Sequence, residues 1–189
     1  AMSIQGGHWV WSASLRYLFM MLFLTVIVLF QGGIKQIRAL AELFFTHWKF
    51  WILAGSVGFG LFYALICFSA DFSPGWVIAS TWQFTVVASL FIFMLFGRKF
   101  PKRVWLFSLL IFTGVMLVNM SHVDQFNLKA LLMGGLPVIV AAFCYPFGNQ
   151  LVWEAKQSNG RWIPRITSPV LDNALNKVLL MTIGSMPLW

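Results

Sequence analysis

The chain has 189 residues, of which 60% are hydrophobic and only 10% are charged, and its formal net charge is +8 at pH 7. A soluble domain carries about 25% charged residues, so this composition excludes an ordinary soluble protein. Apart from Arg16 and Lys49, the basic residues lie outside the apolar runs and form no continuous basic face, which argues against a nucleic-acid partner.

Five apolar runs are long enough to cross a membrane as helices, which takes about 20 residues for a hydrocarbon layer of about 30 Å. We expect these spans at residues 9–30, 48–68, 76–96, 104–120 and 130–152. Only Arg16 and Lys49 are charged within them, and none contains Asp or Glu. Glu154 follows the fifth span and is expected to be solvated at its cytoplasmic end.

Basic and uncharged loops alternate along the chain. Lys and Arg occur in loops 31–47, 97–103 and 153–177, whereas segments 1–8 and 69–75 have none and loop 121–129 has only Lys129. The positive-inside rule therefore places the basic loops in the cytoplasm and the first residues outside. The N-terminus is then outside although no signal peptide precedes it, and the last apolar run is too short to cross the membrane. Both observations predict an internal fragment with five complete transmembrane helices plus the start of a sixth.

The first span, with the sequence WSASLRYLFMMLFLTVIVLF over residues 11–30, contains one arginine. A guanidinium at the bilayer centre costs about 2.5–3.5 kcal/mol on insertion scales. Arg16 either extends its side chain to the outer headgroups or faces the helix bundle. In the second case it binds an anionic group of the substrate or holds a neighbouring helix, and we count it as a candidate substrate-binding residue.

The fifth span places polar residues on one helical stripe, because Ala141, Tyr145, Asn149 and Val152 follow each other at helical spacing. Lipid cannot satisfy an amide, so this stripe is expected to face the bundle interior. Tyr145 and Asn149 are therefore candidate substrate-binding residues, the alternative being contacts that hold helices together.

Two prolines also lie in this span, and each is expected to bend the helix because it removes an amide hydrogen and crowds a carbonyl. They are Pro137 and Pro146. The carbonyl that each proline leaves free should be buried or line a cavity.

In the third span Trp82 and Gln83 are further candidates for substrate binding, since Gln83 is the only amide there. Thr81, Thr85 and Ser89 form a separate stripe of small residues that we interpret as helix packing. No motif for a metal, a phosphate group or a Ser-His-Asp triad can be assembled from the sequence, so no cofactor, metal site or catalytic residue is predicted.

Several stretches together resemble the drug/metabolite transporter superfamily. The run ASLRYLFMMLFLTVIVLF resembles a second helix, ASTWQFTVVASLFIFMLFGRKFPKRVW a fourth helix with its basic turn, and LLIFTGVMLVN a fifth helix. The segments GGHWVWSASLRYLFM, CYPFGNQLVWEA and SPVLDNALNKVLLMTIGSMPLW are similar to the ten-helix, EamA-like transporters described as multidrug resistance efflux transporters.

This resemblance implies an all-α polytopic membrane protein built from inverted five-helix repeats. Residues 1–127 would then hold the second to fifth helices of the first repeat, and residues 128–189 the start of the second repeat. Such repeats bind their substrate near the membrane midplane at the repeat interface.

From this resemblance we expect the protein to be a secondary transporter that exports small organic solutes or drugs by alternating access, in a bacterial inner membrane. Its expected partners are a small-molecule substrate and membrane lipid. The alternatives are a membrane-embedded enzyme, which should show clustered titratable groups at membrane depth, and a membrane scaffold that transports nothing.

Overall fold

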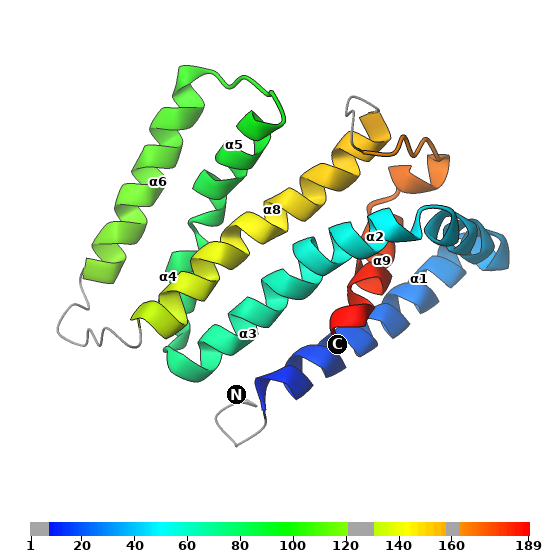
Figure 1. Ribbon diagram of the computed structural model, residues 1–189, viewed down its shortest axis with the longest axis horizontal. Helices are drawn as coiled ribbons and strands as arrows, with labels where there is room; N and C mark the ends of the chain where they lie inside the picture. Colours follow the sequence, from blue (N-terminus) through cyan, green and yellow to red (C-terminus); the bar gives the residue numbers. More distant parts are fainter. Residues whose placement is uncertain (1–7, 121–130, 158–162) are drawn as a thin grey trace.

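The computed structural model describes residues 8–120, 131–157 and 163–189, and every regular element in these ranges is a helix. Figure 1 shows how the helices succeed one another. In chain order they are α1 (Trp9–Thr46), α2 (Trp48–Gly55), the π-helical turn η2 (Ser56–Leu61), α3 (Phe62–Phe72), α4 (Gly75–Trp82), α5 (Thr85–Leu95), α6 (Lys102–Met120), the π-helical turn η4 (Leu131–Gly135), α8 (Leu136–Gln157), the short helix η5 (Pro169–Asp172), α9 (Ala174–Ser185) and η6 (Met186–Leu188).

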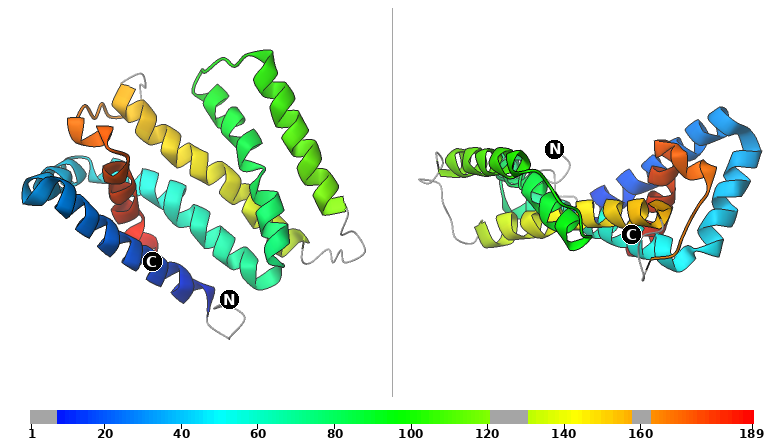
Figure 2. Two further views of the ribbon diagram at one scale, coloured as in Figure 1. Left: turned by 180° about the vertical axis from the view of Figure 1, so that it is seen from behind. Right: turned by 90° about the horizontal axis from the view of Figure 1, so that it is seen from above.

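The helices run back and forth side by side, with α6 at one edge and α1 at the other (Figure 1). Both views of Figure 2 show the same order. Between the edges α8 packs against α3 and α5, and α9 packs against α1 and α2. The largest buried cluster joins α1, α2, α8 and α9 around Trp51, Leu151 and Leu180. α8 is thus the central helix, and it is in contact with both sides of the assembly.

The helices fall on all five expected spans, which confirms the all-α membrane fold. Four stretches of the described residues are long and apolar enough to cross a bilayer, namely Trp9–Thr46, Trp48–Phe72, Gly75–Leu95 and Leu132–Gln157. α6 occupies the remaining expected span, and Ala174–Leu188 is a shorter apolar helix where a sixth was expected to start. The expected repeat boundary between residues 127 and 128 lies outside the described residues and stays a prediction.

One expected loop is mostly helical. The segment 31–47 was predicted to connect two spans, but α1 continues through it to Thr46 after a sharp change of direction at Gly33. Gly33 has a φ of 67°, a conformation that glycine adopts at little cost. Beyond it Leu40 is buried, whereas Lys35 and Arg38 are exposed. The segment is amphipathic, and its apolar side packs against the buried core through Leu40.

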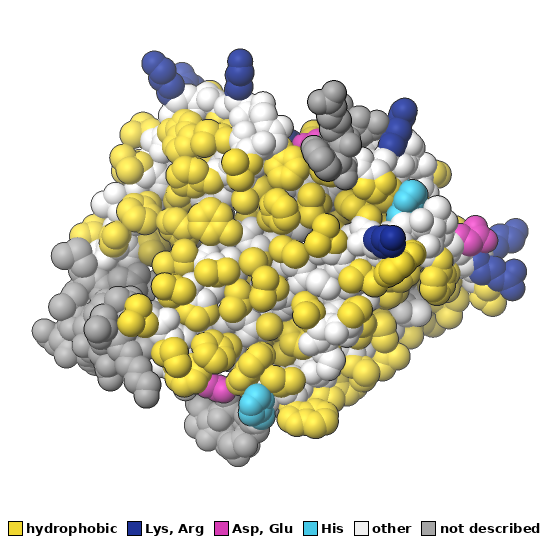
Figure 3. Space-filling model, viewed as in Figure 1, with side chains coloured by type: hydrophobic (Ala, Val, Ile, Leu, Met, Phe, Trp, Pro, Cys, Tyr) yellow, Lys and Arg dark blue, Asp and Glu magenta, His cyan; other side chains and the backbone are white. Residues whose placement is uncertain are grey.

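The surface has the character of a protein in lipid. Large apolar side chains are exposed along the helices, among them Phe23, Phe30, Leu95 and Phe107. Figure 3 shows this apolar surface across the middle of one face, with most Lys and Arg side chains at its edges. In the folded chain the α5–α6 turn and the C-terminal end of α8 lie at the same end of the bundle (Figure 1). The protein is an integral, multi-pass membrane protein.

Glycines allow the central helices to approach closely. Gly58 of η2 faces Gly148 of α8, and Gly55 of α2 faces the backbone of Gly184 in α9. A Cβ atom at any of these positions would meet the backbone of the neighbouring helix. Small residues at helix crossings are a common means of tight packing inside membranes. Lipid is as apolar as the helix surfaces, so the hydrophobic effect does not drive the helices together there, and close van der Waals contact takes its place.

Candidate functional site

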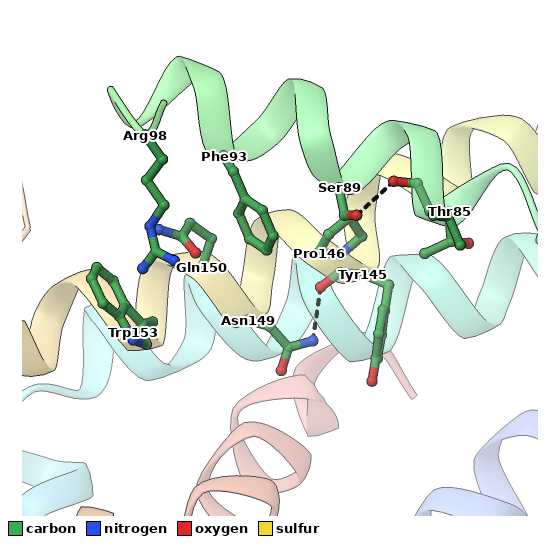
Figure 4. A pocket seen from close by; sticks show the side chains of 10 residues that line it. Thr85, Ser89, Phe93, Arg98, Tyr145, Pro146, Asn149, Gln150 and Trp153 are labelled. Carbon is green, nitrogen blue, oxygen red and sulfur yellow. Dashed lines mark hydrogen bonds between the residues drawn. The ribbon is translucent and has the colours of Figure 1, made fainter. Parts of the chain in front are cut away.

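A cavity of about 510 Å³ lies between α5 and α8. This volume is within the range of small-molecule sites, about 300–1,000 Å³. Its wall combines apolar rings with a few polar groups, and Figure 4 shows the residues that form it. They are Thr85, Val86, Ser89, Phe93, Arg98, Tyr145, Pro146, Asn149, Gln150 and Trp153.

Tyr145 and Asn149, both predicted from the helical stripe, line this cavity. Each is exposed, and the Asn149 Nδ2 donates to the Tyr145 carbonyl at 2.9 Å (Figure 4). Because that bond satisfies only one of the two amide hydrogens, the other hydrogen and the amide oxygen are available to a ligand. The two outer members of the stripe, Ala141 and Val152, are instead buried against other helices.

Trp82 joins Tyr145 in a cluster of aromatic rings. Their ring centroids are 5.8 Å apart, and Phe62 contacts both, at 4.8 Å from Trp82 and 5.2 Å from Tyr145. Phe59 stacks on the other side of Tyr145 at 6.5 Å. The cluster brings together rings from η2, α3, α4 and α8 beside the cavity, and it fixes the orientation of Tyr145.

Gln83 lies where the third span is interrupted between α4 and α5, and its side chain is exposed. Gln83 is not one of the residues that line the α5–α8 cavity. Thr85 and Ser89, which we interpreted as packing residues, do line it. The Thr85 hydroxyl donates to the Trp82 carbonyl of α4 at 2.6 Å, and the Ser89 hydroxyl donates to the Val86 carbonyl of its own helix at 2.8 Å. The role of Gln83 in binding stays a prediction.

Arg98 lies at the cytoplasmic mouth of this cavity by the predicted topology. It follows α5, and its guanidinium carbon lies 3.5 Å from the ring centroid of Trp153 and 5.3 Å from that of Phe93. Figure 4 shows the guanidinium reaching from the α5 side toward Gln150 and Trp153 of α8. Its Nη2 is buried and has no hydrogen-bond partner among the described residues. The arginine thus presents an unmatched donor at the edge of the cavity.

Glu154 corrects an expectation. We predicted a solvated residue beyond the fifth span, but α8 extends to Gln157 and Glu154 is only 5% exposed. Its Oε1 accepts a hydrogen bond of 2.8 Å from Nε2 of Gln150, which is itself 3% exposed and lines the cavity. The carboxylate therefore belongs to the buried side of α8.

Arg16 is held by α3 and lies apart from the α5–α8 cavity wall. Its Nη1 donates to the Tyr63 hydroxyl at 2.8 Å, and its guanidinium carbon lies 4.5 Å from the Tyr63 ring centroid. Next to it, the buried Tyr17 donates to the Phe59 carbonyl at 2.8 Å. These contacts agree with the interpretation in which Arg16 holds a neighbouring helix, while its contact with substrate stays a prediction.

The two prolines differ in position. Pro146 lies inside α8 and contributes to the cavity wall, whereas Pro137 is the second residue of α8 and directly follows the π-helical turn η4. Pro137 thus marks the junction of two helix types, and the bends expected at Pro137 and Pro146 stay predictions.

A second cavity of about 270 Å³ lies between α8 and α9 and shares Asn149 and Trp153 with the first. Lys156 and Lys177 also line it. Lys156 forms an ion pair with Asp172 of η5, and this hydrogen bond lowers the pKa of the Asp172 carboxyl. The two cavities thus have two lining residues of α8 in common.

The sequence contained a signal for one residue that we missed. Tyr145, Asn149 and Trp153 follow each other at intervals of four, so the stripe could have been continued to Trp153. Arg98 gave no such signal, because its basic turn was already explained by membrane topology.

A bundle of long apolar helices with a cavity of small-molecule size between α5 and α8 defines a polytopic helical membrane protein. The chain belongs to the EmrE family, described as "Putative multidrug resistance efflux transporter", whose model matches residues 1–189. It is a family of transporters of small molecules.

Two bacterial relatives match the whole chain. An uncharacterized protein, YjlA, of Bacillus subtilis (strain 168) is 37% identical over 202 aligned residues, and 58% of that protein is covered. An uncharacterized 42.1 kDa protein of Shouchella clausii, from the intracellular alkaline protease 3′ region, is 35% identical over 198 residues, with 48% of it covered. The chain thus spans about half the length of these relatives. No solved structure gives a significant match.

Proposed function

We propose that the protein is a secondary transporter that exports small organic solutes or drugs by alternating access, in a bacterial inner membrane. The observation that carries this proposal is the α5–α8 cavity, in which apolar rings and a few polar groups meet inside a helical membrane bundle. Membership of a family of efflux transporters supports the direction of transport.

The position of the cavity also supports this proposal. α5 belongs to the segment 1–127 that we assign to the first repeat, and α8 belongs to the segment 128–189 that we assign to the second. Transporters with inverted repeats bind their substrates at the interface between the repeats. The repeat division and the binding site are thus proposed together, and a failure of one weakens the other.

An enzyme is the alternative function. Among the described residues, no three His, Cys, Asp or Glu side chains come together in a way that could hold a metal ion. The buried Glu154 is paired with an amide and has no second titratable partner in the described part of α8. We favour transport because the cavity offers groups that bind and orient a solute.

The test is export of fluorescent substrates from bacteria that express the protein. We expect faster loss of a preloaded lipophilic dye than in cells with an empty vector, and a several-fold slower loss in the Asn149→Ala variant. Asn149 lines both cavities and offers a free amide hydrogen to a ligand.

Thr113→Ala is the matched control. Thr113 is an exposed residue of α6 whose hydroxyl donates to its own helix at 2.9 Å, so its loss should leave transport unchanged. Expression of each variant is compared by quantitative immunoblot. Equal export by the Asn149→Ala variant and the wild type, at equal membrane levels, contradicts the proposed site.

A further inference from the structure

The two cavities beside α8 carry charge of one sign. Three charged side chains occur among the residues that line them, and all three are cations: Arg98 in the α5–α8 cavity, and Lys156 and Lys177 in the α8–α9 cavity. No Asp or Glu lines either cavity in the described part of the chain. The Glu154 carboxylate is engaged with Gln150 on the buried side of α8.

The cations differ in how far their charge is already balanced. Lys156 is paired with Asp172. No ion pair of Arg98 or Lys177 is found within the described residues. Arg98 is thus the one charged residue in the lining of the α5–α8 cavity, and an anion that enters this cavity meets no carboxylate among the described lining residues.

Arg98 also suits a carboxylate. Its guanidinium carbon lies 3.5 Å from the Trp153 ring centroid at the edge of the cavity. Its Nη2 is buried and lacks an acceptor among the described residues. A buried charged donor without a partner is costly, so a ligand oxygen that reaches the guanidinium is favoured. A planar carboxylate matches the guanidinium with two parallel hydrogen bonds.

The rest of the α5–α8 cavity fits the apolar body of such a ligand. Phe93 and Trp153 supply rings close to Arg98, Tyr145 supplies a ring farther along the cavity (Figure 4), and Pro146 and Val86 add apolar surface. Rings of this kind stack on aromatic ligands with centroid distances of about 4.5–7 Å. The volume of about 510 Å³ leaves room for a ligand of one or two fused rings.

We propose that the α5–α8 cavity takes small organic anions, namely carboxylates with an aromatic body, and that Arg98 binds the carboxylate. This inference names the substrate class of the proposed transport site, and so it rests on the proposed function. The lysines of the α8–α9 cavity add positive charge near Asn149 and Trp153, which line both cavities.

The test compares three probes of the same shape and different charge. The purified protein, in nanodiscs of zwitterionic phosphatidylcholine, is titrated by calorimetry with 2-naphthoate, 2-naphthamide and 2-naphthyltrimethylammonium. We expect 2-naphthoate to bind best and the cation to bind worst. Tighter binding of the cation than of the carboxylate overturns the proposal.

The variants assign the effect to Arg98. Arg98→Gln should weaken 2-naphthoate binding by about tenfold or more and leave the neutral amide unchanged, because only a charged, forked donor pairs with both oxygens. Arg98→Lys should give an intermediate affinity. Arg103→Gln is the control, since it removes an exposed cation at the start of α6 and changes the net charge equally. Equal losses in Arg98→Gln and Arg103→Gln overturn the proposal.

The headgroup of an anionic lipid is another anion that Arg98 could bind. A second set of nanodiscs, which contains phosphatidylglycerol, tests this alternative. If a phosphatidylglycerol headgroup occupies Arg98, 2-naphthoate binds the wild type more weakly in discs with that lipid, and the site belongs to lipid. Unchanged affinity supports the proposal. Variants are compared only when their thermal unfolding in nanodiscs matches the wild type, and Arg98→Lys serves if Arg98→Gln does not fold.

The result also separates this inference from the proposed function. If cells expressing Arg98→Gln still export a cationic dye and 2-naphthoate fails to bind the wild type, the substrate class is wrong while transport stands. If neither dye nor carboxylate is moved or bound, both proposals fail.

Discussion

The close crossing of α8 and η2 predicts a large effect of a single methyl group. In Gly148→Ala the new Cβ would lie 2.8 Å from the Gly58 nitrogen and 2.9 Å from the Ala54 oxygen, whereas ordinary contact begins at 3.4 Å. All the atoms that it meets belong to the backbone, so no side chain can rotate away. The two helices must therefore separate.

The size of the effect follows from this separation. A gap of roughly 0.6 Å forfeits a quarter to a half of the dispersion energy of the atoms that face it. Overpacking of a tight interior costs about 1–3 kcal/mol, and the better helix propensity of alanine offsets up to about 1 kcal/mol. We expect a net loss of about 1–2 kcal/mol, which lowers the midpoint of thermal unfolding by about 2–8 °C.

The assay is thermal unfolding of the purified protein in dodecyl maltoside, followed by circular dichroism. Gly114→Ala is the matched control, because Gly114 is an exposed glycine of α6 with nothing within 4 Å of the added Cβ. That variant should be as stable as the wild type or slightly more stable. If Gly148→Ala unfolds at the same temperature as Gly114→Ala, α8 and η2 do not pack as described.

Three further predictions concern single residues. Arg16→Lys should slow dye export, because a lysine cannot keep both the hydrogen bond and the ring contact of the guanidinium; wild-type rates in this variant contradict it. Glu154→Ala should lower the free energy of unfolding by about 1–3 kcal/mol, since it leaves a buried amide without an acceptor, and Glu154→Gln should cost less, as urea titration can show. In a variant without native cysteines, a cysteine at Lys99 should resist an impermeant maleimide in intact cells, and one at Phe72 should react. The reverse labelling pattern would show that the predicted orientation in the membrane is wrong.

The sequence determined the environment of this protein and most of its secondary structure. Length and hydropathy are local properties, so the positions of the membrane spans followed from composition alone. The alternation of basic loops predicted which turns share one end, and the folded chain brings the α5–α6 turn and the end of α8 together as expected. The stripe in α8 also identified Tyr145 and Asn149 as residues of one wall.

The tertiary structure decided which faces of the helices are buried. In lipid both faces of a helix can be apolar, so periodicity marks the buried side only weakly. Glu154 and Gln150 are both buried on α8, and their burial cannot be read from the sequence of α8 alone. The loop predicted after Phe30 likewise became helical because Leu40 reaches the core.

The pairing of Arg98 with Trp153 is the strongest case. The two residues are distant in the sequence and meet only because α5 packs along α8. In the sequence Arg98 is one of several cations in a basic turn, and nothing distinguishes it from Lys99 or Arg103. Only the packing of the two helices removes its Nη2 from solvent and places Arg98 at the wall of a cavity, because burial depends on neighbours that the local sequence does not specify.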